Sequence, residues 1–168
     1  IEPAQFGAMI DGLMQARGIA ILGLRNSYPV ALHLRQQLLQ VRPQVSLLAQ
    51  PGQTLAEEVA DLSPQDVVVV VAFRRRPRVI QPLLHQLQLR QVPVLLISEP
   101  QAHALLPLST WSLCTPLDSV SAFDCYSAAM SVVGLLSNAL LHEMLQPGRQ
   151  RIHHIADLYS DLDELEQR

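Results

Sequence analysis

The feature of this sequence that most limits its fold is an unbroken apolar run, VVVVVAF, at residues 67–73. A strand with one solvent-facing side alternates apolar and polar residues, whereas this run contains no polar position. Its β-branched side chains favour a strand, and such a strand needs other elements to cover both of its faces. The run therefore predicts the centre of a parallel sheet with helices packed on either side.

The rest of the chain alternates between strand and helix patterns. Four further strands are expected at residues 19–24, 45–49, 93–98 and 110–114. Helices are expected at residues 4–17, 29–41, 78–91 and 120–145, and a short one should begin at the capping-box pair Thr54 and Glu57. This order predicts an α/β fold, a three-layer α/β/α sandwich with a five-stranded parallel sheet and right-handed crossovers.

The whole chain, residues 1–168, is expected to form one domain. It divides into a leading helix at residues 1–18, an α/β core at residues 19–146 and a C-terminal amphipathic helix at residues 147–168. The long helix before this last one is expected to end at Pro147-Gly148. The final helix has one narrow apolar stripe, the pattern of a docking or pairing helix. The stripe consists of Ile152, Ile155, Leu158, Tyr159, Leu162 and Leu165.

Bulk properties argue against several classes of function. The net charge is −3, so this chain alone lacks the basic excess that binds a nucleic-acid backbone. No apolar run approaches the roughly 20 residues that span a bilayer, and no signal peptide opens the chain. Cys114 and Cys125 lack CxxC spacing, which predicts buried free thiols in a reducing compartment. We expect a cytoplasmic protein without a membrane partner, and Ile1 at the start indicates a piece of a longer chain.

Two loops of unusual composition follow predicted strands. Leu24-Arg25-Asn26-Ser27-Tyr28 follows the first strand, and Arg74-Arg75-Arg76-Pro77-Arg78 follows the third. We call them the first loop (residues 24–28) and the arginine loop (residues 74–78). In open parallel sheets, ligands bind beyond the carboxyl ends of the strands, where the strand order reverses. Both loops are therefore candidates for a single binding site.

Each loop has a functional and a purely structural interpretation. Ser27 precedes a helix, where free N–H groups and the helix dipole favour an anion. Alternatively, Ser27 or Tyr28 only caps that helix. The arginines cannot enter the core unpaired. They form either a solvated or salt-bridged rim, or a mouth in which each guanidinium binds two oxygens of a phosphate or carboxylate.

Other chemical motifs are missing from the sequence. There is no GxGxxG, no GxxxxGK(S/T) and no GxSxG. The six histidines show no HExxH or other ligand spacing, and His153 and His154 are expected to face solvent from the final helix. We therefore expect no metal and no cofactor.

With both loops placed, several segments in order resemble the SIS (sugar isomerase) domain of the RpiR/MurR family of bacterial transcription regulators. They are IAILGLRNSY, TLAEEVADLSPQDVVVVVAF, PVLLISEP, the long helix and the tail RIHHIADLYSDLDELEQR, and TLAEEVADLSPQDVVV is the most specific. The resemblance implies a flavodoxin-like sheet, a homo-oligomer (dimer or tetramer), and binding of phosphorylated sugars or related metabolites. It also implies that DNA is contacted only through an N-terminal helix-turn-helix domain, which this chain is expected to lack.

The resemblance also implies which residues hold the ligand. In the family, a serine after the first strand binds the phosphate, and Ser27 matches it. The family's loop after the third strand reads S-x-S-G-x-T, whereas this chain has AFRRRP at residues 72–77. Arg74 replaces a key serine and Pro77 replaces the threonine. The arginines are therefore expected to recognise a carboxylate or a differently placed phosphate.

An enzyme of this family needs a positioned base, usually a glutamate at the start of the last long helix. This chain has LDSVSAF there, and Asp118 is the only carboxylate. Asp118, with Ser119 and Ser121, is expected to cap the helix or to line the pocket. We therefore predict an effector-sensing domain without catalytic activity. An isomerase-type enzyme and a dimerisation scaffold with a degenerate pocket are the alternatives. The predicted ligand-binding residues are Arg25, Asn26, Ser27, Arg74, Arg75, Arg76, Asp118, Ser119 and Ser121.

Overall fold

Five parallel strands form one sheet in the computed structural model, which describes residues 2–165. The ends of the predicted domain, at Ile1 and residues 166–168, lie outside the described residues. The strand order is β2-β1-β3-β4-β5, and every neighbouring pair is parallel. The strands are β1 (Ile19–Gly23), β2 (Val45–Leu47), β3 (Val67–Val71), β4 (Val94–Ser98) and β5 (Trp111–Cys114). The predicted α/β sandwich is therefore confirmed, with the valine run at its centre.

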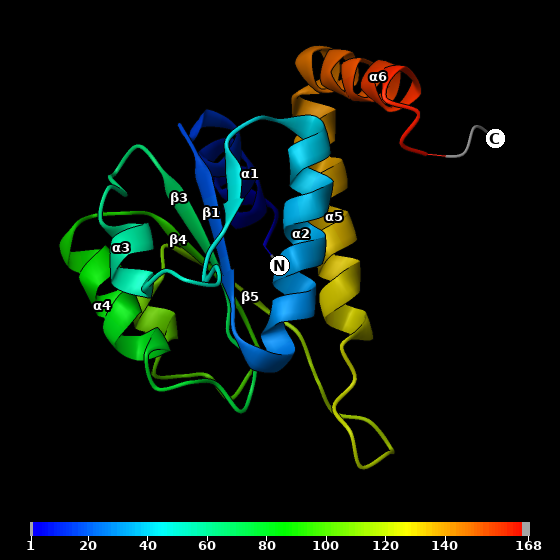
Figure 1. The fold of residues 1–168 in the computed structure, drawn as a ribbon. Helices are drawn as coiled ribbons and strands as arrows, with labels where there is room; N and C mark the ends of the chain where they lie inside the picture. Colours follow the sequence, from blue (N-terminus) through cyan, green and yellow to red (C-terminus); the bar gives the residue numbers. More distant parts are fainter. Residues whose placement is uncertain (1, 166–168) are drawn as a thin grey trace.

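Helices cover both faces of this sheet (Figure 1). One face packs against α1 (Pro3–Gln15), α2 (Tyr28–Val41) and α5 (Ser127–Glu143). The other packs beneath α3 (Leu55–Val59), α4 (Ile80–Leu89) and the 3₁₀ turn η2 (Leu106–Leu108). Alternate residues of β3 enter the two cores: Val67, Val69 and Val71 enter the first, and Val68 and Val70 enter the second. This two-sided burial explains why the run tolerates no polar residue.

The expected start of the long helix at residue 120 is wrong, because α5 begins at Ser127. The segment before it folds on itself through its own side chains. Ser119 Oγ donates to the Phe123 carbonyl at 2.7 Å and accepts from the Ser121 N–H at 3.1 Å. Such local bonds compete with the backbone bonds of a helix. Asp118 therefore lies in a loop and does not cap α5.

The expected helix end at Pro147-Gly148 is also wrong. α5 ends at Glu143, and α6 (Leu145–Asp161) begins after a single intervening residue, Met144, and runs through both positions. Pro147 is tolerated because the first-turn N–H groups of a helix have no intrahelical acceptor. Gly148 is buried, and a Cβ there would lie 2.9 Å from Leu141 Cδ1, so a larger residue would require that leucine side chain to move.

The last two helices meet at a sharp bend, and α6 crosses the end of α5 and α2 (Figure 1). Among the described residues, no single helix is long and apolar enough to cross a membrane. The helices α5 and α6 reach the length and apolar composition of a membrane span only when they are counted together, and they are bent by 109° relative to each other. Arg151 Nε fixes α6 to α2 by donating to the Leu39 carbonyl at 2.8 Å. His153 and His154 are exposed, as expected.

The expected burial of the two cysteines is wrong, although both thiols are free. Cys114 is the last residue of the edge strand β5, where Leu113 turns into the core and its neighbour turns outward. Cys125 lies in the loop before α5. Both thiols are exposed, so neither supplies an argument about the redox compartment.

Candidate functional site

The first loop and the arginine loop lie side by side at the carboxyl edge of the sheet. Ser27 is 3% exposed, and its Oγ accepts a hydrogen bond from the Phe73 N–H at 3.0 Å. Arg25 Nη1 donates to the carbonyl of Arg75 at 3.1 Å. The turn that allows this contact needs Gly23, because a Cβ there would lie 2.6 Å from the Ser27 carbonyl oxygen. Two segments separated by about fifty positions are thus joined by two hydrogen bonds.

Ser27 does not use its side chain to cap α2, which was the purely structural interpretation. The hydroxyl is the acceptor in its contact with Phe73, so this contact leaves its proton unused. Asn26 is exposed next to it. The first loop therefore places a buried hydroxyl and an exposed guanidinium, that of Arg25, at one point of the edge.

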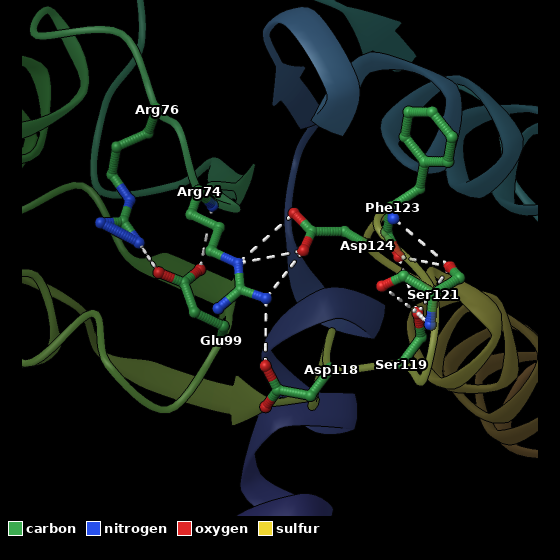
Figure 2. A network of polar contacts seen from close by, with 8 residues as sticks. All are labelled: Arg74, Arg76, Glu99, Asp118, Ser119, Ser121, Phe123 and Asp124. Carbon is green, nitrogen blue, oxygen red and sulfur yellow. Dashed lines mark hydrogen bonds and ion pairs between the residues drawn. The ribbon is translucent and has the colours of Figure 1, made fainter.

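Arg74 is the most heavily bonded residue of the arginine loop (Figure 2). Its Nη2 donates to Asp124 Oδ1 at 2.7 Å and to Asp118 Oδ1 at 3.0 Å, and its Nε donates to Asp124 Oδ1 at 3.2 Å. These hydrogen bonds raise the pKa of Arg74 and lower the pKa of Asp124. Asp124 therefore remains ionised and is a poor proton acceptor at neutral pH.

Arg76 is paired with a different carboxylate. Its guanidinium forms an ion pair with Glu99, a buried residue directly after β4, and its Nε donates to the Ala72 carbonyl at 3.1 Å. Glu99 also accepts from the N–H of Arg74 at 3.2 Å. Arg75 takes part in none of these side-chain contacts and is exposed. The arginine loop thus contains two paired guanidiniums, those of Arg74 and Arg76, and two exposed arginines, Arg75 and Arg78.

Asp118 is brought to the site, whereas the two predicted serines are not. Figure 2 shows Ser119 and Ser121 turned toward Phe123 and away from Arg74. Their hydroxyls lie 2.9 Å apart and bond within their own loop. We call residues 118–124 the acidic loop, because its two ends carry the carboxylates that bind Arg74. Ser119 and Ser121 support the shape of this loop, and no contact places them at the arginines.

Three buried hydroxyls gather at the same edge without a hydrogen-bond partner among the described residues. Ser98 ends β4 and is fully buried, and Thr115 follows β5 and is 3% exposed. The third is Tyr126, just before α5, whose ring lies 5.6 Å from that of Phe73. Because an unpaired buried hydroxyl costs about 1–3 kcal/mol, these three atoms are candidates for contact with a bound molecule.

Sequence reasoning missed Glu99 and Asp124 as members of this site. The signal for Glu99 was present, since a charged residue directly after the apolar strand VLLIS is placed as the arginines are after β3. Asp124 had no such signal, because it lies in an irregular loop that brings it fifty positions back to Arg74. Among the described residues, no group of three or more His, Cys, Asp or Glu side chains could hold a metal ion.

The carboxyl edge combines guanidiniums, hydroxyls and carboxylates, and an opening beside α4 adjoins it without being lined by any of the hydroxyls or carboxylates named above. A hollow of about 260 Å³ borders the arginine loop there and is lined by Arg76, Pro77, Arg78, Gln81, Gln101, Ala102, Ala104 and Leu105. Arginine forks bind phosphate or carboxylate oxygens in pairs. The three carboxylates of the edge, those of Glu99, Asp118 and Asp124, all contact an arginine. The arrangement suits anion binding better than proton transfer.

Comparison with known proteins gives one family. The family model described as the SIS domain matches residues 12–139. No curated protein matches the sequence.

Several solved structures are similar in fold. The sugar isomerase domain of an RpiR transcription factor from Sphaerobacter thermophilus is 19% identical, with a TM-score of 0.85 over 93% of this chain and 87% of that one. The Vibrio vulnificus NanR protein, complexed with ManNAc-6P, is 20% identical, with a TM-score of 0.80 over 96% of this chain and 62% of that one. A Methanococcus jannaschii protein, whose structure infers a 3-hexulose-6-phosphate isomerase function, is 8% identical, with a TM-score of 0.68 over 90% of this chain and 83% of that one. Identities this low show the fold alone.

Proposed function

This chain belongs to the SIS domain family, and from that premise we propose that it is the effector-binding and dimerisation domain of an RpiR-type transcription regulator. Its effector is a sugar phosphate or another small anionic metabolite. The observation that carries this proposal is the junction of the first loop and the arginine loop, where Ser27 Oγ lies 3.0 Å from the Phe73 nitrogen. The junction lies at the carboxyl edge of a parallel sheet, the place where such sheets bind ligands.

The similar structures support the regulator role. Two of them are an RpiR transcription factor and NanR, and NanR was solved with ManNAc-6P. This chain spans 62% of the length of NanR. In the proposed protein, an N-terminal helix-turn-helix domain binds DNA in the cytoplasm. The effector acts by shifting the arrangement of a dimer or tetramer of SIS domains, and so the spacing of the DNA-binding heads.

An isomerase-type activity is the weaker alternative, although one structure of similar fold carries an inferred isomerase function. An isomerase needs a carboxylate free to accept a proton from carbon. Asp118 and Asp124 are held by Arg74, and Glu99 is held by Arg76. We therefore propose a non-catalytic domain.

One observation favours a second candidate, a dimerisation scaffold whose pocket no longer binds a metabolite. Two of the arginines that would hold an anion are already neutralised by carboxylates of the same edge. This scaffold and the sensor differ in one measurable property, the response of the domain to small anions.

The test is a thermal-shift screen of the domain with ManNAc-6P, other sugar phosphates and a set of organic acids. A ligand at 100 times its Kd stabilises the folded state by about 2.7 kcal/mol, which corresponds to a rise of roughly 5–10 °C for a chain of this size. The rise should disappear in the double variant Ser27→Ala/Arg74→Gln. It should persist in Arg149→Gln, which removes an exposed arginine charge on α6, away from the carboxyl edge. A double variant that responds as the parent does would place the ligand elsewhere, and a parent without any response would favour the scaffold.

A further inference from the structure

In the described part of the chain, the acidic loop forms side-chain hydrogen bonds to one residue outside itself, Arg74. Its base is closed by one backbone hydrogen bond, from the Cys125 N–H to the Leu117 carbonyl at 2.9 Å. Within the part of the chain that the structure describes, the remaining hydrogen bonds of residues 118–124 are internal or go to Arg74. Removing the guanidinium would therefore leave the loop without any other polar anchor.

Apolar packing does not hold the loop either. Val120 and Phe123, its two large apolar side chains, are 111% and 83% exposed. Figure 1 shows the segment before α5 projecting beyond the sheet and the start of the helix. The ion pairs that remain are partly exposed, with 40% of the Arg74 side chain and 72% of the Asp118 side chain accessible. Water and salt weaken charge pairs that are open to solvent, so a competing anion can break them.

A second observation concerns the roots of the loop. Thr115 precedes it and Tyr126 follows it, and both carry a buried hydroxyl without a partner among the described residues. Ser98 Oγ is in the same condition at the end of β4, and the Ser98 carbonyl accepts the N–H of Thr115 at 2.9 Å. Buried hydroxyls are normally satisfied in the state for which a site is built. Thr115 and Tyr126 lie on the side of the sheet that α1, α2 and α5 cover, whereas the Ser98 side chain lies on the opposite side. The hydroxyls of Thr115 and Tyr126 are therefore the candidate contacts for a bound molecule that carries oxygen atoms of its own.

We propose that Asp118 and Asp124 occupy Arg74 in place of the acid group of the effector, and that the effector binds by exchange. Its carboxylate or phosphate binds the guanidinium, the acidic loop is released, and the effector's hydroxyls are bound near Thr115 and Tyr126. This inference rests on the proposed function and deepens it, because it names an anion with several hydroxyl groups as the ligand class. The planar guanidinium binds carboxylate and phosphate oxygens in the same forked geometry, which makes the exchange possible.

The exchange predicts that removing the internal carboxylates strengthens anion binding. Inorganic phosphate is titrated into the domain at constant ionic strength, with chloride as the replaced ion. Asp118→Asn/Asp124→Asn should bind phosphate several-fold more tightly than the parent, and Arg74→Gln should bind it several-fold more weakly. The control Asp11→Asn/Asp61→Asn removes the same two charges at exposed positions outside the acidic loop, and should bind as the parent does.

The second readout is hydrogen exchange of the acidic loop, including the Cys125 amide. Phosphate should speed exchange at residues 118–125 in the parent, and Arg74→Gln should show fast exchange without phosphate. The inference is overturned if the double asparagine variant binds no more tightly than its control, or if phosphate slows exchange in the loop. When a sugar phosphate stabilises the parent but the asparagine variant gains nothing, the exchange alone is wrong. If neither the parent nor the double asparagine variant binds any anion, both the exchange and the proposed function are wrong.

Discussion

Arginine has two different roles in this molecule, and the surrounding acceptors determine which one a given residue has. Arg42 is buried and donates to the carbonyls of Leu13 at 2.5 Å and Ala16 at 2.6 Å, which closes the end of α1. Arg90 binds the Val59 carbonyl at 2.8 Å in the same way after α3. These guanidiniums satisfy helix ends. Arg74, in contrast, binds only carboxylate oxygens, which an incoming anion can replace.

Arg17 and Asp66 form a structural pair at the opposite, amino edge of the sheet. Arg17 Nη2 donates to Asp66 Oδ2 at 2.6 Å, and the Ser63 N–H donates to the same oxygen at 3.0 Å. The hydrogen bond from Arg17 lowers the pKa of Asp66 below its ordinary value of 3.8. A carboxyl with a depressed folded-state pKa stabilises the protein above its unfolded pKa, and this contribution is lost as the pH falls through the folded pKa.

Asp66→Asn should therefore lower the free energy of unfolding at pH 7, and the difference from the parent should narrow as the pH falls below about 3.8. Urea unfolding at pH 7 and at a pH below the ordinary carboxyl range measures this difference. Asp11→Asn, at an exposed position on α1, is the control. A gap between parent and variant that is equally wide at both pH values would contradict the assigned ion pair.

At the scale of elements, the regular parts followed the sequence pattern and the irregular part did not. The capping box at Thr54 and Glu57 forms as expected, with the Glu57 N–H donating to Thr54 Oγ1 at 3.2 Å. The predicted helix start at residue 120 is wrong because the hydroxyls of Ser119 and Ser121 form local hydrogen bonds. Hydrophobic periodicity contains no information about such bonds. For the same reason, the sequence pattern predicted neither the acidic loop nor the position of Asp124 within it.

The last helix remains a predicted pairing surface. The helix expected over residues 147–168 ends at Asp161, so Leu162 and Leu165 of its apolar stripe lie beyond it. Leu158 on α6 is 41% exposed, and Leu162, directly after α6, is 67% exposed. If α6 pairs with a second copy, Leu158→Gln/Leu162→Gln should weaken self-association at least tenfold, because burying a leucine contributes about 1.5–3 kcal/mol. Sedimentation equilibrium measures the association constant.

The matched control for this prediction is Leu89→Gln, which changes a leucine on α4 that is 75% exposed. It should associate as the parent does. An unchanged association constant in the α6 variant would mean that the copies meet through other surfaces.

At the scale of the whole molecule, the strand order explains why the two loops singled out in the sequence lie together. β1 is followed by β2 on one side and is paired with β3 on the other, so the loops after β1 and β3 must meet where the order reverses. The identity of the two loops was therefore predictable. What faces them was only partly predictable. Asp118 was among the predicted residues and Glu99 directly follows β4, whereas Asp124 reaches Arg74 through an irregular segment whose path no periodic pattern encodes.

The amino edge of the same sheet offers a competing location. Hollows of about 380 and 330 Å³ lie there, and both are bordered by Arg17 and Asp66. The hydrogen bonds of that pair are to each other and to neighbouring residues, and Asp66 holds the turn at Ser63. This edge is built for the stability of the fold, whereas the carboxyl edge holds the unpaired hydroxyls.

The most direct test of the central claim is a ¹H–¹⁵N titration of the domain with a sugar phosphate that raises its thermal midpoint. The account predicts that the largest changes in amide chemical shift occur at residues 24–28, 73–76 and 115–126, and that the Phe73 amide is among them. Largest changes at Arg17, Gly18 and Asp66, at the amino edge, would contradict it.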